Sequence, residues 1–238
     1  PFDQVPKKYV DMYEGKSYRD LLNRPNVDLE APHPQAKQHV KNYFAAVTGT
    51  DEQFGRILDA LDEHGLSDNT IVVFTADHGE MMGSHNRMHK SVVYEESTGI
   101  PFIIRWPGRI PARRDDLLLS PTDMMPSLLG LMGLSARIPS GVEGRDYSAI
   151  MLGKTRERPN SVLYIRCSGP RGGARGVRTH RYTFAVTPKQ DGGKATLLFD
   201  NKNDPYQLRN VAESKPEIVS EITEELQRWL ERTDDPWE

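Results

Sequence analysis

The sequence predicts an α/β fold in which a mixed or parallel sheet is flanked by helices and is followed by a small antiparallel sheet with its own helix. Three observations support this prediction. An amphipathic helical pattern precedes a continuous apolar strand between residues 40 and 75, which is typical of a sheet covered by helices. After residue 160 the pattern changes to short β-like runs, and the chain then closes on a second amphipathic helix.

The first expected element is a long helix. Apolar residues recur at spacings of three, four and seven from Val40 to Leu61, which places them on one helical face. Gly65 follows this pattern, and glycine readily adopts the left-handed conformation found just after a helix. We therefore expect the helix to end there.

Two strands are expected after this helix. The run from Ile71 to Phe74 is apolar without alternation, which indicates that both faces of the strand are covered, as in a parallel sheet. A second run, over 101–106, ends at the Pro107-Gly108 turn. Both segments are predicted to lie in the main sheet.

A helix is predicted from Pro121 to Met132. Ser120 is a favourable N-cap residue, and proline at the first helical position leaves no backbone donor unpaired. Asp123 supplies an acidic side chain in the first turn, as in a capping box.

The C-terminal part reads as a small antiparallel sheet, because its β-like runs are short and are separated by turn residues. These runs cover residues 162–165, 176–179, 182–186 and 196–199. A last helix, over 216–231, is apolar on one side and is expected to pack on this sheet. The predicted domains are residues 1–158, an α/β domain, and residues 159–238, an α+β subdomain.

Composition excludes several classes of protein. Charged residues make up 27% of the chain and nearly cancel to a formal net charge of −3, which argues against a nucleic acid partner. No apolar run approaches the roughly 20 residues of a membrane span. The single cysteine, Cys167, excludes an internal disulfide and a multi-cysteine metal site. We expect Cys167 to be a small buried apolar residue.

Asp77 and His78 directly follow the strand that ends near Thr75. Ligands of open α/β sheets bind beyond the carboxyl ends of strands, and carboxylate and imidazole groups both bind divalent cations. Gly79 lets the backbone turn sharply, so that neighbouring side chains can face one ion. The alternative is that the aspartate only forms a turn or caps a helix.

The segment after this motif holds His85, His89 and Lys90, which are too polar and too closely spaced for an ordinary core. A lysine ammonium that faces an anionic substrate stabilises the negative charge that develops on a leaving group. The alternatives are a solvated lysine and surface histidines.

The residues from Thr75 to Gly108 together resemble the sulfatase family. The matching segments are Thr75-Ala76-Asp77-His78-Gly79-Glu80-Met81-Met82-Gly83-Ser84-His85, Met88-His89-Lys90, Tyr94-Glu95-Glu96-Ser97 and Ile100-Pro101-Phe102-Ile103-Ile104-Arg105-Trp106-Pro107-Gly108. Similar matches occur in the helices over 51–61 and 123–134 and in the tail over 198–206. The resemblance therefore covers nearly the whole chain.

The resemblance implies an alkaline-phosphatase-like α/β core and hydrolysis of sulfate esters or sulfamates. It assigns Asp77 and His78 to a pair of metal ligands, although His78 stands where many members carry Asn. It assigns Lys90 to the lysine that contacts the sulfate and its bridging oxygen, and His85 and His89 to the substrate side of the pocket. It gives Gly79 and Glu80 no chemical role and implies a structural one for Tyr94, Glu95 and Glu96.

The family nucleophile is a formylglycine made from Cys or Ser in a Cys/Ser-x-Pro/Ala-x-Arg motif, and no segment of this chain matches that motif. Cys167 lies in the predicted C-terminal sheet and is followed by Ser168-Gly169-Pro170-Arg171, which does not match the motif. We expect the nucleophile, and a first pair of metal ligands, in a missing N-terminal half, and we expect this piece alone to be inactive. A phosphate or phosphonate monoester hydrolase of the same superfamily and a non-catalytic fragment remain alternatives.

The resemblance also implies the cofactors, partners and location. The expected cofactor is calcium or another divalent metal such as magnesium, with formylglycine supplied by the missing part. The expected partners are a sulfated small molecule or sugar and the N-terminal half of the catalytic domain. A periplasmic or secreted location is the prediction, although no signal region lies in this sequence.

Overall fold

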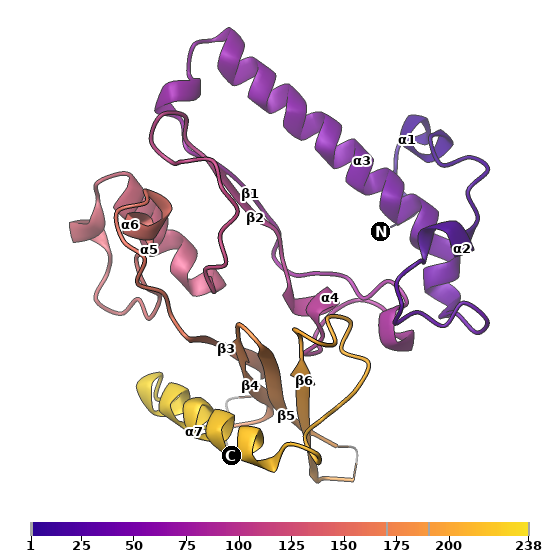
Figure 1. Cartoon of the computed structure of the whole chain (residues 1–238). Coiled ribbons are helices and arrows are strands. Elements are labelled where there is room, and N and C mark those ends of the chain that lie inside the picture. Colours follow the sequence, from indigo (N-terminus) through magenta and orange to yellow (C-terminus); the bar gives the residue numbers. More distant parts are fainter. Residues whose placement is uncertain (1, 170, 190, 238) are drawn as a thin grey trace. The chain divides into compact units, whose positions relative to one another are not determined.

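The computed structural model describes residues 2–169, 171–189 and 191–237 (Figure 1). It divides the chain into two compact units, Pro1–Pro107 and Gly108–Glu238. The α/β architecture agrees with the sequence prediction. The predicted domain boundary after residue 158 concerns the whole protein and stays a prediction.

Helix α3 dominates the first unit. It runs from Pro34 to Glu63, which corresponds to a length of about 45 Å. Its end is a Schellman motif, in which Leu66 N donates to Leu61 O at 2.8 Å and the next hydrogen bond inward joins Gly65 N to Asp62 O. Gly65 has a φ of +64°, so the predicted helix end is confirmed.

The N-terminal segment of the first unit packs on α3. Short helices α1 (Lys7–Asp11) and α2 (Tyr18–Leu21) lie beside it (Figure 1). A buried cluster joins α2 and the segment that follows it to α3, and one of its members, Met82, comes from the loop after the first strand. The cluster consists of Leu21, Leu22, Val27, Ala36, Val40 and Met82. The apolar face predicted for α3 packs in this cluster at Val40, Tyr43 and Phe44, whereas Val47 and Ile57 of the same face are 55% and 56% exposed.

The two predicted strands of the first unit are confirmed, as β1 (Val72–Thr75) and β2 (Phe102–Arg105). The sequence predicts a mixed or parallel sheet around β1. Within the described chain β1 pairs only with β2, and the pairing is antiparallel, with Val73 opposite Ile104. An apolar run shows that a strand has covering surfaces, but it carries no information on the direction of its neighbours. The connection between the strands contains α4 (Glu95–Thr98).

The second unit begins with two helices. Helix α5 spans Pro121–Leu131 and α6 spans Ser148–Met151. The Asp123 carboxylate accepts a hydrogen bond from Ser120 N at 2.8 Å, as the predicted capping box requires. Its other oxygen accepts from Arg145 N at 2.8 Å, which ties the start of α5 to the chain before α6.

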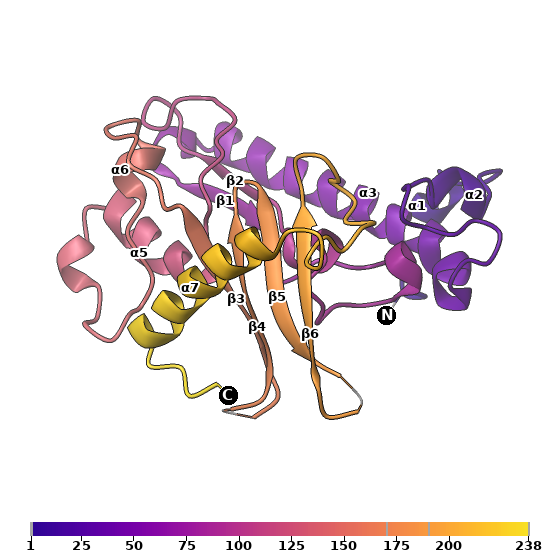
Figure 2. The same ribbon diagram turned by 60° about the horizontal axis from the view of Figure 1, so that its bottom comes forward.

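The C-terminal sheet is an antiparallel meander in the order β3-β4-β5-β6, as the sequence predicts. Its strands are β3 (Ser161–Cys167), β4 (Gly173–Thr179), β5 (Tyr182–Pro188) and β6 (Lys194–Asp200). Helix α7 (Pro216–Arg232) crosses one face of the sheet (Figure 2). The core between them consists of Val177, Phe184, Leu198, Ile222, Leu226 and Leu230.

Cys167 corrects one expectation. It lies at the end of β3 and is exposed, so the prediction of a buried apolar residue is wrong. β3 is an edge strand with a single partner, β4, and the end of an edge strand is covered on fewer sides than a central strand.

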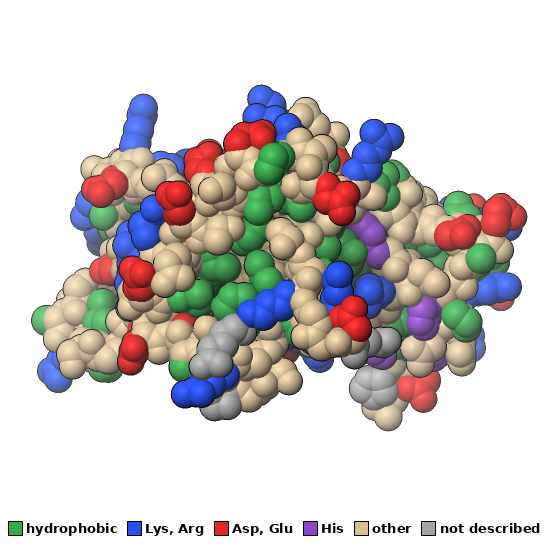
Figure 3. All heavy atoms as spheres, turned by 90° about the horizontal axis from the view of Figure 1, so that it is seen from below, with side chains coloured by type: hydrophobic (Ala, Val, Ile, Leu, Met, Phe, Trp, Pro, Cys, Tyr) green, Lys and Arg blue, Asp and Glu red, His purple; other side chains and the backbone are tan. Residues whose placement is uncertain are grey.

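Apolar surface remains in both units. Ile103 on β2 is 60% exposed, and hydrophobic side chains reach the surface between charged ones on the face shown in Figure 3. Exposed apolar surface of this kind is typical of regions that another part of a protein covers. In the described part of the chain, no helix is both long and apolar enough to cross a membrane.

Candidate functional site

Asp77 and His78 lie together where β1 ends. The Asp77 side chain is 87% exposed, and His78 Nε2 lies 3.3 Å from Asp77 Oδ2. His78 Nδ1 lies 2.7 Å from the carbonyl oxygen of Gly79, and a carbonyl only accepts hydrogen bonds, so Nδ1 carries the proton. In the neutral ring the lone pair is then on Nε2, which faces the carboxylate side and is available to a cation.

Gly79 fixes the direction of the chain after this pair. Its N–H donates to Ser97 O at 2.9 Å, and a Cβ at this position would lie 2.0 Å from Glu96 O. No side chain larger than hydrogen fits without moving that backbone. The close approach holds the Asp77-His78 segment against α4, which explains the glycine in the motif in physical terms.

Glu80 joins the two arms of the loop that follows. Its Oε1 accepts hydrogen bonds from Met82 N at 3.1 Å and from His89 N at 2.6 Å. In addition, Met81 N donates to His89 O at 2.8 Å. These bonds hold the backbone of His89, the residue before Lys90, beside Glu80. Glu80 itself follows His78 by two residues, which corresponds to about 7 Å of extended chain.

Left-handed backbone conformations are concentrated in this loop. Five of the seven non-glycine residues with positive φ in the described chain lie between residues 82 and 91, and they are Met82, His85, Asn86, His89 and Ser91. Each costs about 1 kcal/mol or more relative to a right-handed residue. Strain of this kind persists where the surrounding structure holds it, and it clusters at functional sites.

Gly83 anchors the tip of the loop to α3. Its φ is +93°, and an added Cβ would lie 2.9 Å from the Cβ of Ala36. Next to it, Met81 and Met82 are buried. The loop is thus held from the inside by apolar contacts while Lys90 stays exposed.

His85 belongs to a separate polar cluster beneath the loop. Its ring stacks on Tyr94 at 3.8 Å between centroids, and its Nε2 lies 3.2 Å from Asn26 Nδ2. Asn26 Nδ2 also donates to Glu96 Oε1 at 2.7 Å, and Arg24 approaches the same oxygen at 3.2 Å. The predicted role of His85 at the substrate stays a prediction. Tyr94 and Asn26 hold its ring in place.

Sequence reasoning missed the contribution of Asn26 to this cluster, and it gave Glu96 a structural role without naming its partners. Asn26 precedes His85 by 59 positions, so no local spacing could connect them. The Glu96 side chain is only 3% exposed. This burial is visible only in the folded chain, so the sequence carries no signal of it. Both residues are brought to the loop by the fold alone.

The pKa of Tyr43, on α3, is affected by burial and by the charge of Glu80. Burial raises the pKa of the Tyr43 hydroxyl, and the negative charge of Glu80 raises it further. Glu80 therefore acts on the α3 side as well as on the backbone of the loop.

All five residues predicted for the site lie on this one loop of the first unit. Asp77 and His78 are in contact, His89 is held by Glu80, Lys90 follows His89 and is exposed, and His85 lies in the Asn26 cluster. Among the residues that the structure describes, no group of three His, Cys, Asp or Glu side chains is close enough to hold a metal ion. Asp77 and His78 can therefore supply only part of a coordination shell.

Comparison with known protein families gives two matches. The family model described as Sulfatase matches residues 1–134. The model described as N-sulphoglucosamine sulphohydrolase, C-terminal, matches residues 83–235. The two matches together extend over both units.

Curated relatives of high similarity are sulfatases. An endo-4-O-sulfatase from Bacteroides thetaiotaomicron is 42% identical over 244 residues, which cover 95% of this chain and 47% of the relative. An ulvan-active sulfatase from Formosa agariphila is 36% identical over 228 residues, covering 92% and 42%. The chain spans less than half the length of each of these relatives.

Solved structures share the fold. One from the glycosaminoglycan metabolism of Bacteroides thetaiotaomicron has a TM-score of 0.90 and 39% identity, covering 99% of this chain and 51% of that one. Another, in complex with its substrate D-glucosamine-2-N,6-O-disulfate, has a TM-score of 0.76, 25% identity and coverages of 84% and 42%. A phosphonate monoester hydrolase from Silicibacter pomeroyi has a TM-score of 0.73, 25% identity and coverages of 96% and 47%.

Proposed function

Since the chain belongs to the sulfatase family, we propose that the whole protein is a sulfuric ester hydrolase to which these 238 residues contribute the Asp77–Lys90 loop. The observation that carries the proposal is the Glu80 contact, which holds the backbone of His89, the residue before Lys90, against the segment that follows Asp77 and His78. One loop thereby supplies both cation ligands and an anion-binding ammonium group.

The donor set fits a divalent cation. Asp77 presents an exposed carboxylate, and His78 presents Nε2 on the same side. A bound calcium or magnesium ion would act as a Lewis acid toward a sulfate oxygen. Because a closed oxygen-rich site needs about six ligands, most of the shell must come from residues other than these two.

Lys90 would bind the sulfate group and stabilise the charge on the leaving oxygen. A lysine ammonium is a compact point charge with three donors, and Glu80 fixes the backbone just before it through His89 N. His89 lies next to Lys90 and is exposed, so it can reach the same substrate. Preorganised donors of this kind lower the barrier because they need no rearrangement when the charge develops.

The nucleophile lies, in this proposal, in a part of the whole protein outside these 238 residues. The chain spans less than half of its curated relatives, and no Cys/Ser-x-Pro/Ala-x-Arg motif occurs in it. Formylglycine is the group that the family implies. Cys167 is exposed at a strand end of the second unit, and we assign it no catalytic role.

A sulfated saccharide is the substrate class that we propose. One matching family model is described as N-sulphoglucosamine sulphohydrolase, and one solved relative holds a disulfated glucosamine. A phosphonate monoester hydrolase is the second candidate, because one such enzyme shares the fold over 96% of this chain. Its 25% identity is lower than the 42% of the endo-4-O-sulfatase, which favours sulfate hydrolysis.

The test uses the whole protein and two single variants, Asp77→Ala and His78→Ala. We expect both to lose bound metal, measured by elemental analysis, and to lose most turnover of an aryl sulfate. Asp59→Ala, on the exposed side of α3, is the matched control and should keep both. Wild-type protein assayed with an aryl phosphonate monoester separates the two candidate functions.

Normal metal content and normal turnover in both variants would contradict the assignment of Asp77 and His78. Faster cleavage of the phosphonate than of the sulfate would replace the proposed function by the second candidate.

A further inference from the structure

A polar cavity of about 720 Å³ lies in the second unit, between the segment before α5 and the segment after α6. It is far richer in positive than in negative side chains. Its charged lining residues are Arg113, Arg114, Asp115, Asp116, Arg156 and Arg158. The lining therefore carries an excess of two formal positive charges. None of these residues belongs to the loop described above.

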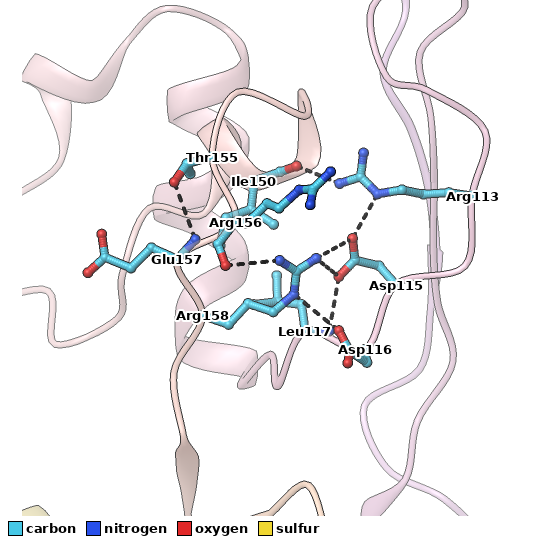
Figure 4. Close-up of polar contacts among 9 residues, drawn as sticks. All are labelled: Arg113, Asp115, Asp116, Leu117, Ile150, Thr155, Arg156, Glu157 and Arg158. Atoms are coloured by element: carbon cyan, nitrogen blue, oxygen red, sulfur yellow. Dashed lines mark hydrogen bonds and ion pairs between the residues drawn. The ribbon is translucent and has the colours of Figure 1, made fainter.

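Asp115 is shared by two of the arginines (Figure 4). Its Oδ2 accepts from Arg113 Nε at 2.7 Å, and Arg158 Nη2 lies 2.8 and 2.9 Å from the two carboxylate oxygens. Although burial opposes the effect, hydrogen bonds from Arg113 and Arg158 hold the pKa of Asp115 below its usual range. One carboxylate thus orients two guanidinium groups and can balance the charge of only one.

The second acid adds little to this balance. Asp116 Oδ1 lies 3.1 Å from Arg158 Nε, but the Asp116 side chain is 78% exposed, and an exposed pair of this kind is largely screened by water. Arg113 is held from its other side, because its Nη2 donates to Ile150 O at 2.5 Å. The guanidinium groups of Arg113 and Arg158 are therefore fixed in place at the cavity.

Arg114 and Arg156 have no acidic partner among the residues that the structure describes. In Figure 4 the Arg156 side chain extends toward the guanidinium group of Arg113, with no contact drawn between the two. Arg113 and Arg156 carry like charges, which repel each other where they face the same cavity. A ligand with negative charge between them removes that repulsion and gains bidentate hydrogen bonds from planar guanidinium groups.

We propose that this cavity is a second oxyanion-binding site, with Arg156 and Arg114 as its ligand-binding residues and Asp115 as the group that orients Arg113. The ligand chemistry is a sulfate group, either inorganic sulfate or a sulfate ester on a saccharide. The choice of sulfate among oxyanions rests on the proposed function. The excess of positive charge does not depend on it.

The alternative is that the four arginines only tie the two segments together. The ion pair of Asp115 with Arg158 already does this. Arg114 and Arg156 make no such pair, so their removal separates the two explanations. The relevant variant is therefore Arg114→Ala/Arg156→Ala, which leaves the Asp115 pairs intact.

The experiment is equilibrium dialysis of the whole protein against radiolabelled inorganic sulfate at constant ionic strength. A Lys90→Ala background removes sulfate binding at the proposed active site. We expect this background to retain one sulfate site, and the added Arg114→Ala/Arg156→Ala change to weaken that site at least tenfold. Arg114→Lys/Arg156→Lys keeps the charge and should weaken it less. Arg137→Ala, an exposed arginine of the same unit, should leave it unchanged.

A kinetic arm separates the two sources of sulfate. If the site serves saccharide sulfate groups, the double alanine variant with Lys90 intact raises KM for a polysulfated oligosaccharide several-fold and leaves KM for a monosulfated aryl ester unchanged. If it serves inorganic sulfate, both KM values stay the same and only the dialysis result changes. Either result supports the site.

Equal sulfate binding with and without Arg114 and Arg156 would overturn the inference, as would an equal loss in the Arg137→Ala control. Failure of the proposed function looks different, because the wild-type protein would then cleave the aryl phosphonate monoester faster than the aryl sulfate, whatever happens at Arg114 and Arg156.

Discussion

The two sheets of this chain are held in different ways. The β3–β6 sheet buries Phe184 and Leu198 under α7, so that apolar packing holds its strands in one arrangement. The β1–β2 pair has half-buried strands, and the loop between them is held by the Glu80 hydrogen bonds and by close contacts at Gly79 and Gly83. Stability thus depends on apolar packing in the β3–β6 sheet and on a few polar and backbone contacts near the β1–β2 pair.

This difference shows which part of the chain can carry exposed reactive side chains. A packed core tolerates little change in shape, and its residues contact only one another. A loop that is anchored by a few contacts leaves Asp77 and Lys90 exposed and His78 partly exposed. Changes in the β3–β6 sheet should therefore lower stability and spare the chemistry of each folded molecule, and changes in the loop should do the reverse.

Phe184→Ala should have the largest effect on stability. Phe184 is 1% exposed, and removing a buried aromatic ring typically destabilises a protein by about 3–5 kcal/mol. Thermal unfolding of the whole protein should show a clearly lower midpoint, while turnover per folded molecule at low temperature stays normal. The control is Leu208→Ala, at a side chain that is 55% exposed in the same unit. If both variants unfold at the same temperature, the β3–β6 core is not what holds this unit.

Lys90→Ala should have the next largest effect, on rate. Loss of one preorganised donor at a developing charge typically slows turnover about 10²–10³-fold. We expect this loss in aryl sulfate hydrolysis with an unchanged unfolding midpoint, and a greater loss for poor leaving groups than for good ones. Lys202→Ala, at an exposed lysine of the second unit, should behave as wild type. Equal losses for all leaving groups would limit Lys90 to anion binding.

Glu80→Ala should have an intermediate effect. It removes the acceptor that holds His89 N and Met82 N, and a misplacement of about 1 Å in a neighbouring catalytic group costs up to 10²-fold in rate. Glu80→Gln keeps an acceptor oxygen, so it should recover much of kcat. Glu63→Ala, exposed at the end of α3, is the control. If the Gln and Ala variants lose the same activity, the charge of Glu80 matters and its positioning role is wrong.

The smallest effect should be a loss of stability of the second unit in acid. Arg181 holds the pKa of Asp200 down, to about 2 from its usual 3.8, through hydrogen bonds of 2.8 and 3.1 Å. The folded protein therefore binds fewer protons than the unfolded chain, so this contribution is present above pH 4 and is lost as the pH falls toward 2. Asp200→Asn should lower the unfolding midpoint at pH 6 by about 2–4 °C. It should also reduce the fall of that midpoint between pH 4 and pH 2, and an unchanged fall would contradict the assignment.

Local sequence was sufficient for the longer elements, whereas the short helices α1, α2, α4 and α6 were not predicted. Apolar spacing and end signals predicted α3 with its end at Gly65, α5 with its cap at Ser120, and the meander β3–β6 with α7 on it, because these features depend on residues within one or two turns of each other. The antiparallel direction of the neighbour of β1 was left open by the prediction of a mixed or parallel sheet, since burial of a strand does not encode the direction of its partner. The exposure of Cys167 was missed for a similar reason, because it depends on which strand forms the sheet edge.

For the candidate site, the sequence by itself determined the chemical groups and their order along the chain, Asp77, His78, His85, His89 and Lys90. Only the tertiary structure decided how they are grouped. It placed His89, the residue before Lys90, beside Glu80 and His85 in contact with Asn26, and it brought Arg156 toward Arg113 at a cavity that no motif marks. The physical reason is that side-chain chemistry is a property of each residue, whereas proximity between residues far apart in sequence is created by packing and by hydrogen bonds that form only in the folded chain.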